Sequence, residues 1–190
     1  KADAPGVRIT EDHDFMAMGG TATVAVSLKA VLIEDSFILA DPIDAYLKRI
    51  RAGFVLMQCG MALGMVESSI ALMKSVQGPL GHVNKYLDEQ PEDFEEKLST
   101  LREEIETLAQ TPFDPSMAYF RRVVTARLNG GEAAMAAAHS AKLHCGARGY
   151  IGRGEAQRRV REAYFIGIVT PATKQLKKML AELPPAEVPA

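Results

Sequence analysis

Four glycines within nine residues mark the part of this chain that is best suited to binding chemistry. Gly146, Gly149, Gly152 and Gly154 interrupt an alanine-rich run of helical character. Glycine tolerates positive φ and lets another group approach the backbone closely. The spacing therefore predicts a turn that a second molecule can approach, followed by a new helix.

Charged and nucleophilic side chains near this turn are weaker indications of a site. Arg158 and Arg161 share one helix face with Glu162. A structural ion pair is favoured over contact with a ligand, and the partner of the arginines is either Glu162 or another subunit. His144 and Cys145 adjoin the glycines, where either could face a ligand, although a free cysteine usually packs as a buried apolar residue.

No metal site is expected. His139, His144 and Cys145 lie close in sequence, but the first and last are six residues apart, and a helix would not place all three around one ion. The sequence also lacks a Walker loop, a GxSxG nucleophile elbow and an HExxH pattern.

The composition indicates a globular chain without a nucleic-acid partner. With 190 residues and 47% hydrophobic content, it can bury a full core in one or two domains. A net charge of -2 gives no reason to expect nucleic acid or an anionic membrane. No apolar run approaches the ~20 residues of a membrane span, and no signal peptide is recognisable, so we expect no membrane insertion. Two cysteines are too few for a disulfide scaffold, which favours a cytoplasmic location. The start at Lys1, without methionine, is typical of a fragment or a processed product.

Residues 7–39 are predicted to form strands and a turn. Apolar residues alternate along 24–28, and a second apolar cluster follows at 32–39, as in a half-buried sheet. Gly19 and Gly20 mark a turn, and Thr21 and Thr23 beside it are interpreted as strand formers, with a hydroxyl role as the alternative. Two or three strands do not form a stable sheet unaided.

A long helix is predicted next. Asp41 and Pro42 fit its N-cap and first position, with Asp44 in the first turn, where the helix dipole favours an anion. It should run to about Gln77, and the glycines and proline within 78–81 should end it. Its core face is predicted to comprise Leu47, Ile50, Phe54, Met57, Met61, Met65 and Leu72. Core packing is the preferred role for the methionines, and lining a ligand pocket is the alternative.

Three further helices complete the pattern. One should run from Pro91 to about Ala109 with a narrow apolar seam that packs against another helix. Asp114 would cap the next, which local rules end at 129–131, because each glycine costs roughly 1 kcal/mol relative to alanine. Thr170 and Pro171 fit the N-cap and first position of the last helix.

The order of three C-terminal motifs, GARGY, RRVRE and IVTPATKQL, resembles the end of acyl-CoA dehydrogenase-type flavoproteins. In that family a GGxGY turn precedes an RxxRD element and an EGT-type turn into the last helix. The family's last strands are similar to PGVRITEDHDFMAMGGTATVAVSLKAVLIEDSFIL, and its first bundle helix to LKRIRAGFVLMQCGMALGMVESSIALM. Its third helix aligns without gaps to VVTARLNGGEAAMAAAHSAKLHCGARGY, and we follow this alignment in carrying the helix through to about Cys145.

The resemblance implies a mainly α fold: a short β segment followed by an up-and-down four-helix bundle whose fourth helix is broken near Thr170. Residues 1–40 would be the end of the β-sheet domain and 41–190 the C-terminal helical bundle. The implied function is α,β-dehydrogenation of an acyl-CoA thioester in fatty acid metabolism, with FAD as hydride acceptor and a carboxylate as base. Homodimers or homotetramers are implied. Core packing remains the preferred role for the methionines of the first bundle helix, and lining an acyl or flavin pocket remains the alternative.

The resemblance also implies site residues. The cofactor-binding turn, which in the family approaches the FAD diphosphate of a neighbouring subunit, corresponds to Gly146, Ala147, Gly149 and Tyr150. The EGT turn, which usually carries the catalytic glutamate, corresponds to Thr170 or, with a shift of one residue, to Pro171. Neither can be a general base.

Other departures concern the cofactor contacts and the base. The family's second glycine is Ala147, the glutamine before the turn is Leu143, and the RxxFG element is not recognisable within 77–87. Some branches place the base on the first bundle helix, one position from Asp44, and Glu67 lies farther along. The helix dipole explains Asp44 and surface exposure explains Glu67 without catalysis.

Two alternatives to the dehydrogenase stay open. One is a flavin-dependent monooxygenase of the same superfamily, in which reduced flavin activates dioxygen and no α-proton base is needed. The other is a bundle that has lost the cofactor and serves as an oligomerisation or partner-binding module.

Overall fold

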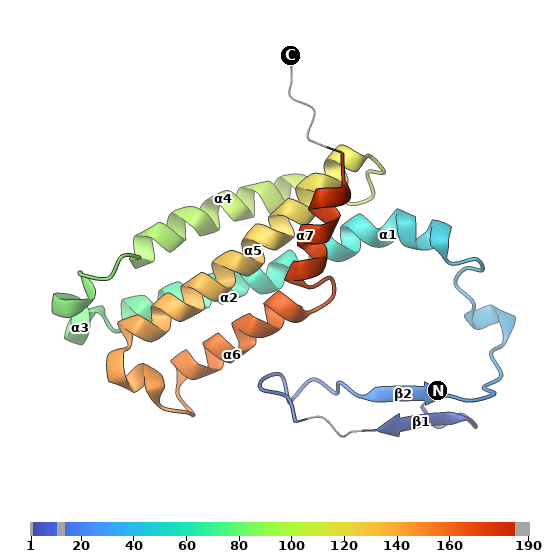
Figure 1. Ribbon diagram of the computed structural model, residues 1–190, viewed down its shortest axis with the longest axis horizontal. Helices are drawn as coiled ribbons and strands as arrows, with labels where there is room; N and C mark the ends of the chain where they lie inside the picture. The colour runs from blue at the N-terminus through green and yellow to red at the C-terminus, as the bar shows by residue number, and fades with distance from the viewer. Residues whose placement is uncertain (1, 11–13, 185–190) are drawn as a thin grey trace, which may run out of the picture. The chain divides into compact units, whose positions relative to one another are not determined.

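The computed structural model describes residues 2–10 and 14–184, which form two compact units, Lys1–Leu47 and Lys48–Ala190. The first unit consists mainly of strand and turn, and the second is helical (Figure 1). The predicted mainly α fold, with a short β segment before a helical bundle, is confirmed.

The β segment is a two-stranded antiparallel sheet. Strands β1 (Val7–Thr10) and β2 (Ala25–Leu28) pair so that Val7 faces Leu28 and Thr10 faces Ala25. The predicted sheet-like packing of 32–39 is wrong, because this segment is mostly exposed and contains the 3-10 helix η1 (Asp35–Phe37). A pair of strands has too little apolar surface to cover such a segment.

The turn predicted at Gly19 and Gly20 is confirmed by a hydrogen bond from Thr21 N to Met18 O, 2.9 Å. The preferred interpretation of its threonines is wrong, since Thr21 and Thr23 lie outside β2. Their hydroxyls hydrogen-bond to each other at 2.7 Å, and Thr21 Oγ1 also donates to Met18 O.

The predicted long helix consists of α1 (Asp44–Met57) and α2 (Cys59–Ser75), followed by α3 (Gln77–Asn84). It begins later than predicted, since Leu47 N donates to Ile43 O, and Asp44 lies in the first turn as expected. The predicted end at about Gln77 agrees with the end of α2 at Ser75, but the glycines and proline within 78–81 do not break the helical path, because they lie inside α3. Pro79 lies in the first turn of α3, where its missing N–H needs no partner, so the helical path continues after Val76.

The core face predicted for this helix is wrong at most of its positions, although Met65 and Leu72 are partly buried and pack against the core of the bundle. Met57 and Met61 are 73% and 37% exposed, and Leu47 and Phe54 are exposed as well. The buried face instead comprises Ala52, Val55, Leu56, Cys59, Ala62, Val66, Ser69, Ile70 and Met73. Apolar residues occur on nearly every side of this helix, so periodicity could not choose between faces, and the smaller residues face the bundle.

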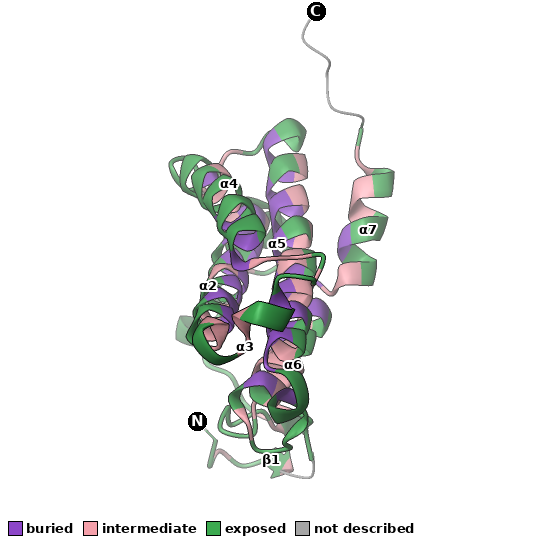
Figure 2. Ribbon diagram, turned by 90° about the vertical axis from the view of Figure 1, so that its left-hand side faces the viewer, coloured by how far each residue is buried: buried purple, intermediate pink, exposed green. Residues whose placement is uncertain are grey.

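Helix α4 (Pro91–Ala109) has the predicted bounds and buries Phe94, Leu98 and Leu108 of its seam. Helix α5 (Met117–His144) passes through 129–131 without a break, as the alignment implied. The predicted cap is displaced: Asp114 Oδ1 accepts from Ser116 N, and Ser116 Oγ accepts from Tyr119 N at the helix start. Helix α5 is buried along much of its length, whereas α4 buries a stripe (Figure 2).

Glycine inside α5 permits close helix packing. A Cβ atom at Gly130 would lie 3.1 Å from the Ala62 Cβ of α2, tighter than ordinary van der Waals contact. Around this contact lies a core of Ala134, Ala137, Ala141, Val66 and Phe94. Helices α2 and α5 contact each other, and both contact α4 and α6 (Glu155–Ile168), which completes the up-and-down bundle (Figure 1).

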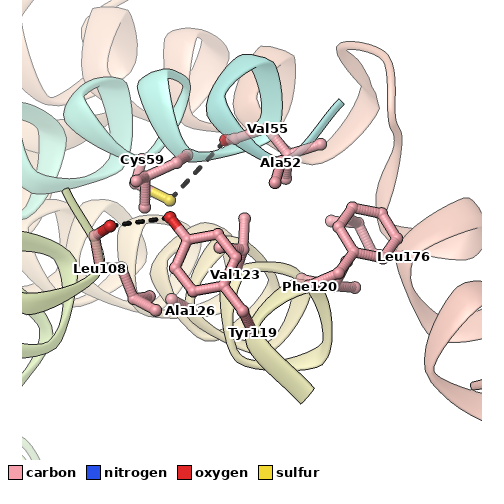
Figure 3. Packing of buried hydrophobic residues seen from close by; sticks show 11 residues of the cluster. Ala52, Val55, Cys59, Leu108, Tyr119, Phe120, Val123, Ala126 and Leu176 are labelled. Atoms are coloured by element: carbon pink, nitrogen blue, oxygen red, sulfur yellow. Dashed lines mark hydrogen bonds between the residues drawn. The ribbon is translucent and has the colours of Figure 1, made fainter. Parts of the chain in front are cut away.

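The chain is broken near Thr170 as predicted, and α7 (Thr173–Glu182) follows. The predicted helix start at Thr170 and Pro171 is wrong: Ala172 is the N-cap, and its N–H donates to Gln175 Oε1 at 2.7 Å. Leu176 of α7 packs into a second core cluster beside Phe120, in which Tyr119 Oη donates to Leu108 O at 2.7 Å (Figure 3).

By length and composition, the described helix Asp44–Ser75 is long and apolar enough to cross a membrane. This is weak support for a membrane span, because core helices of soluble proteins pass the same test. Its α2 part contributes Ala62, Val66, Ile70 and Met73 to the core of the bundle.

Candidate functional site

The glycine turn forms as predicted, as the 3-10 helix η2 (Gly146–Tyr150) between α5 and α6. Gly146 has a φ of +56° and open space where a Cβ atom would lie. Gly149 is required for packing, because a Cβ atom there would lie 2.4 Å from Lys142 O. Two of the glycines thus have separate roles: one sets a left-handed backbone and the other lets η2 fold against the end of α5.

The outer side of this turn is accessible. Gly146, Ala147 and Arg148 are exposed and line a cavity of about 420 Å³, and Tyr150 is 80% exposed. The other walls of the cavity are mostly apolar: Leu72, Val76, Pro79, Leu80, Cys145, Glu155 and Ala156. The cavity therefore combines an apolar wall with an exposed backbone and one guanidinium.

The carboxylate at this cavity is paired. Arg159 and Arg158 both bind Glu155, and hydrogen bonding from Arg159 is the main reason why the pKa of Glu155 is lowered. Arg158 lies 3.9 Å from Glu162, and Arg161 donates to Gly152 O at 3.2 Å. Arg158 thus forms a structural ion pair as predicted, but its nearer partner is Glu155, and Arg161 binds a backbone carbonyl in place of Glu162.

His144 and Cys145 are both buried. His144 Nε2 lies 3.0 Å from Glu89 O, and its Nδ1 has no hydrogen-bond partner. Burial raises the pKa of the Cys145 thiol, whose residue borders the cavity. Among the described residues no group of histidine, cysteine or acidic side chains could hold a metal ion.

The two candidate bases belong to different units of the chain. Glu67 is exposed on α2 and forms a surface ion pair with Arg102 at 3.4 Å. Asp44 is exposed and belongs to the unit Lys1–Leu47. Within the bundle, the glycine turn precedes α6 and Thr170 follows it, so the 14 residues of α6 separate the two turns by about 21 Å.

The Thr170 turn is fixed through backbone carbonyl groups. Thr170 is exposed and Pro171 is buried. At the end of α6, Phe165 O accepts from Val169 N at 2.8 Å and Gly167 O accepts from Thr173 Oγ1 at 3.0 Å. These carbonyl groups would otherwise lack partners at the helix end.

Two buried side chains complete this arrangement, and sequence reasoning missed both. Arg127 of α5 is 1% exposed and donates from Nη2 to Ile166 O at 2.6 Å. Its Nε lies 3.4 Å from Gln58 Oε1, and Gln58 Nε2 donates to Thr170 O at 2.9 Å. Gln58, at the junction of α1 and α2, thus links Arg127 to the turn.

Arg127 is a buried cation that is stabilised by oxygen atoms of neutral groups. Burial lowers its pKa below the ordinary arginine value, and the group stays charged at neutral pH. The carbonyl end of α6 carries partial negative charge, which favours a cation there. Gly131 leaves room for it, because a Cβ atom would lie 3.0 Å from Arg127 Nη1. The sequence shows only a glycine four residues after an arginine in this helix, and that spacing does not identify the contacts of Arg127.

Comparison with solved structures gives the fold. Butyryl-CoA dehydrogenase from Megasphaera elsdenii superposes with a TM-score of 0.78 at 14% identity over 94% of this chain. The chain has the fold of the C-terminal part of the acyl-CoA dehydrogenases. Two further structures share this fold. Prolyl acyl carrier protein oxidase AnaB superposes with a TM-score of 0.71 at 18% identity over 95% of this chain. KijD3, solved in complex with FMN and a dTDP-sugar, superposes with a TM-score of 0.64 at 15% identity over 94% of this chain. No protein-family model and no curated protein matches the sequence.

The chain spans about half the length of these structures, 49% of the butyryl-CoA dehydrogenase chain, 50% of AnaB and 48% of KijD3. The exposed backbone around Gly146 and the Arg148 guanidinium offer polar groups and a positive charge, which suit an anionic group. The turn at Thr170 carries no carboxylate in this sequence.

Proposed function

We propose that this chain is the C-terminal portion of an FAD-dependent, acyl-CoA dehydrogenase-like oxidoreductase that carries out α,β-dehydrogenation of an acyl-CoA thioester. The observation that carries the proposal is an accessible glycine turn, with a guanidinium beside it, in this fold. The exposed Met57 and Met61 add support, because thioether side chains suit an acyl or flavin pocket that other parts of the protein complete.

The roles of the residues follow from their chemistry. A bound FAD would supply the hydride acceptor. The backbone of Gly146 and Ala147, with the Arg148 guanidinium, would hold its anionic diphosphate in a homodimer or homotetramer, and a cytoplasmic location is part of this proposal. The α-proton base must lie outside the Thr170 turn, and Asp44 is the better candidate, because Glu67 is paired with Arg102.

A second candidate function is oxygen chemistry with the same cofactor, as in a flavin-dependent monooxygenase. The absence of a carboxylate at Thr170 and Pro171 favours it, because reduced flavin activates dioxygen without an α-proton base. A cofactor-free oligomerisation module is the third, and the replacement of a family glycine by Ala147 favours it.

The deciding experiment is an absorbance spectrum of the longest native form of the protein, from about 300 to 550 nm, before and after anaerobic addition of an acyl-CoA mixture. A flavin band that bleaches supports the dehydrogenase. A band that persists supports oxygen chemistry, and no band after added FAD supports the cofactor-free module.

A pair of variants tests the cofactor contact. Arg148→Gln should weaken FAD binding about tenfold, because it removes a charged donor beside the glycine turn. Arg153→Gln, an equally conservative change at an exposed position nearby, is the matched control and should leave FAD binding unchanged. Titration of the apoprotein with FAD measures both, and equal affinities would contradict the assignment of the turn.

A further inference from the structure

We propose that Arg127 and Gln58 are positioning residues for the Thr170–Pro171 turn. They are buried, they come from two different helices, and their hydrogen bonds end on carbonyl oxygens on either side of Val169. The importance of this turn for catalysis rests on the proposed function, whereas its positioning can be measured without any cofactor.

The pair holds the turn from the side of the bundle. Arg127 binds Ile166 O in the last turn of α6, and Gln58 binds Thr170 O four residues later. The contact between Arg127 and Gln58 joins the two attachments. The segment between them is therefore fixed at both ends to helices α5 and α2, whatever side chain occupies position 170.

The chemistry of the pair suits positioning better than simple packing. A buried guanidinium is costly unless its donors are satisfied, and an apolar side chain of similar size would fill the same space at lower cost. Gly131 adds a second cost in stability, because glycine has a lower helix propensity than the residues that would otherwise fit there, and only glycine leaves room for Arg127. Both costs are explained if the directed hydrogen bonds to the turn are what the site requires.

The sharpest test is Gln58→Glu in the longest native form of the protein. A glutamate keeps an acceptor for Arg127 and strengthens that contact by charge, but it loses the donor to Thr170 O and sets oxygen against oxygen. The positioning role predicts that the hydrogen-bonded amides of this segment, Val169 and Ala172, exchange with deuterium about tenfold faster while the unfolding midpoint is maintained. Gln110→Glu, the same change at an exposed position, is the matched control.

Arg127→Lys supplies an independent variant. It keeps the charge but lacks the planar fork that serves Ile166 O and Gln58 together, so it should also accelerate exchange at 169–172.

Unchanged exchange at 169–172 in Gln58→Glu would overturn the proposal, as would equal acceleration throughout the bundle. Gln58→Leu removes both polar atoms and is interpreted in the same way if the glutamate variant does not fold. Failure of both to fold would also overturn the proposal, since Gln58 would then support the whole bundle. Localised exchange without a flavin band would leave the positioning role intact and refute only the proposed function.

Discussion

Several buried or half-buried arginines in this protein donate to backbone carbonyl groups. Besides Arg127, Arg121 donates to Leu180 O at 3.0 Å near the end of α7, and Arg159 donates to Ser68 O at 3.1 Å. Arginine suits this role because its donors are fixed in a plane and point in several directions. Single side chains therefore attach α7 to α5 and α6 to α2.

Cys59 gives the protein a pH-dependent stability on the alkaline side. Burial raises the pKa of its thiol from 9.0 to about 11, while Arg127 opposes this shift. The folded state thus keeps a proton that the unfolded state loses, so this contribution is intact below pH 9.0 and is lost as the pH rises towards 11. The free energy of unfolding should fall by about 2 to 3 kcal/mol over that range.

Denaturant unfolding between pH 8 and 11 checks this expectation, with Cys59→Ala as the control that lacks the thiol. The difference between the two proteins isolates Cys59 from other alkaline groups, such as Tyr119, whose pKa is also raised by burial. Parallel pH profiles for the two proteins would contradict the assignment.

Helix α5 contains glycines whose removal should have effects opposite to those of an exposed glycine. Gly130→Ala would force α2 and α5 apart at Ala62 and should destabilise the protein by about 1 to 3 kcal/mol. Gly64→Ala, in α2 with open space around it, should stabilise by up to about 1 kcal/mol through helix propensity. Thermal unfolding of both variants checks the contrast, and stabilisation by both would show that the helices are not in close contact at Gly130.

At the scale of elements, the buried face of a helix could be predicted only where the periodicity of its apolar residues selects one face. The prediction of the buried seam of α4 was correct because only one face of that helix is apolar. The face of α1 and α2 was wrong because apolar residues surround the helix, and the path of α5 through Gly130 required the family alignment. The cap rules failed at Pro42 and at Pro171, since both helices start after the proline.

In the candidate site, too, local sequence patterns predicted local structure but not contacts between distant residues. Local sequence predicted the turn at Gly146, because glycine spacing acts within a few residues. Arg127 and Gln58 were missed because charged and amide side chains are normally assigned to the surface. Their role depends on contacts between positions 69 and 39 residues apart, and no local pattern reports such contacts.

At the scale of the molecule, the two units should differ in stability. Strand β2 is fully exposed and the sheet has only two strands, whereas α5 has buried positions along much of its length. In the chain of residues 1–190 we expect amides of β1 and β2 to exchange within seconds and those around Ala134 to be strongly protected.

Hydrogen exchange on this chain and on the longest native form measures the difference. Protection of β1 and β2 only in the longer form would indicate that the apolar side chains of this unit, such as Leu32 at 91% exposed, are covered there. Strong protection of the strands in the shorter chain would contradict the expectation.

The attachment of the Thr170 turn has a consequence for how this protein can evolve. Gln58 donates to the main-chain oxygen of Thr170, and Arg127 donates to the main-chain oxygen of Ile166 at the end of the preceding helix. The Thr170 side chain itself is exposed. A substitution at position 170 should therefore have little effect on folding, and a single amino-acid change can add or remove an acidic group there. The scaffold thus fixes the main chain of the turn and leaves the side chain at position 170 free to change.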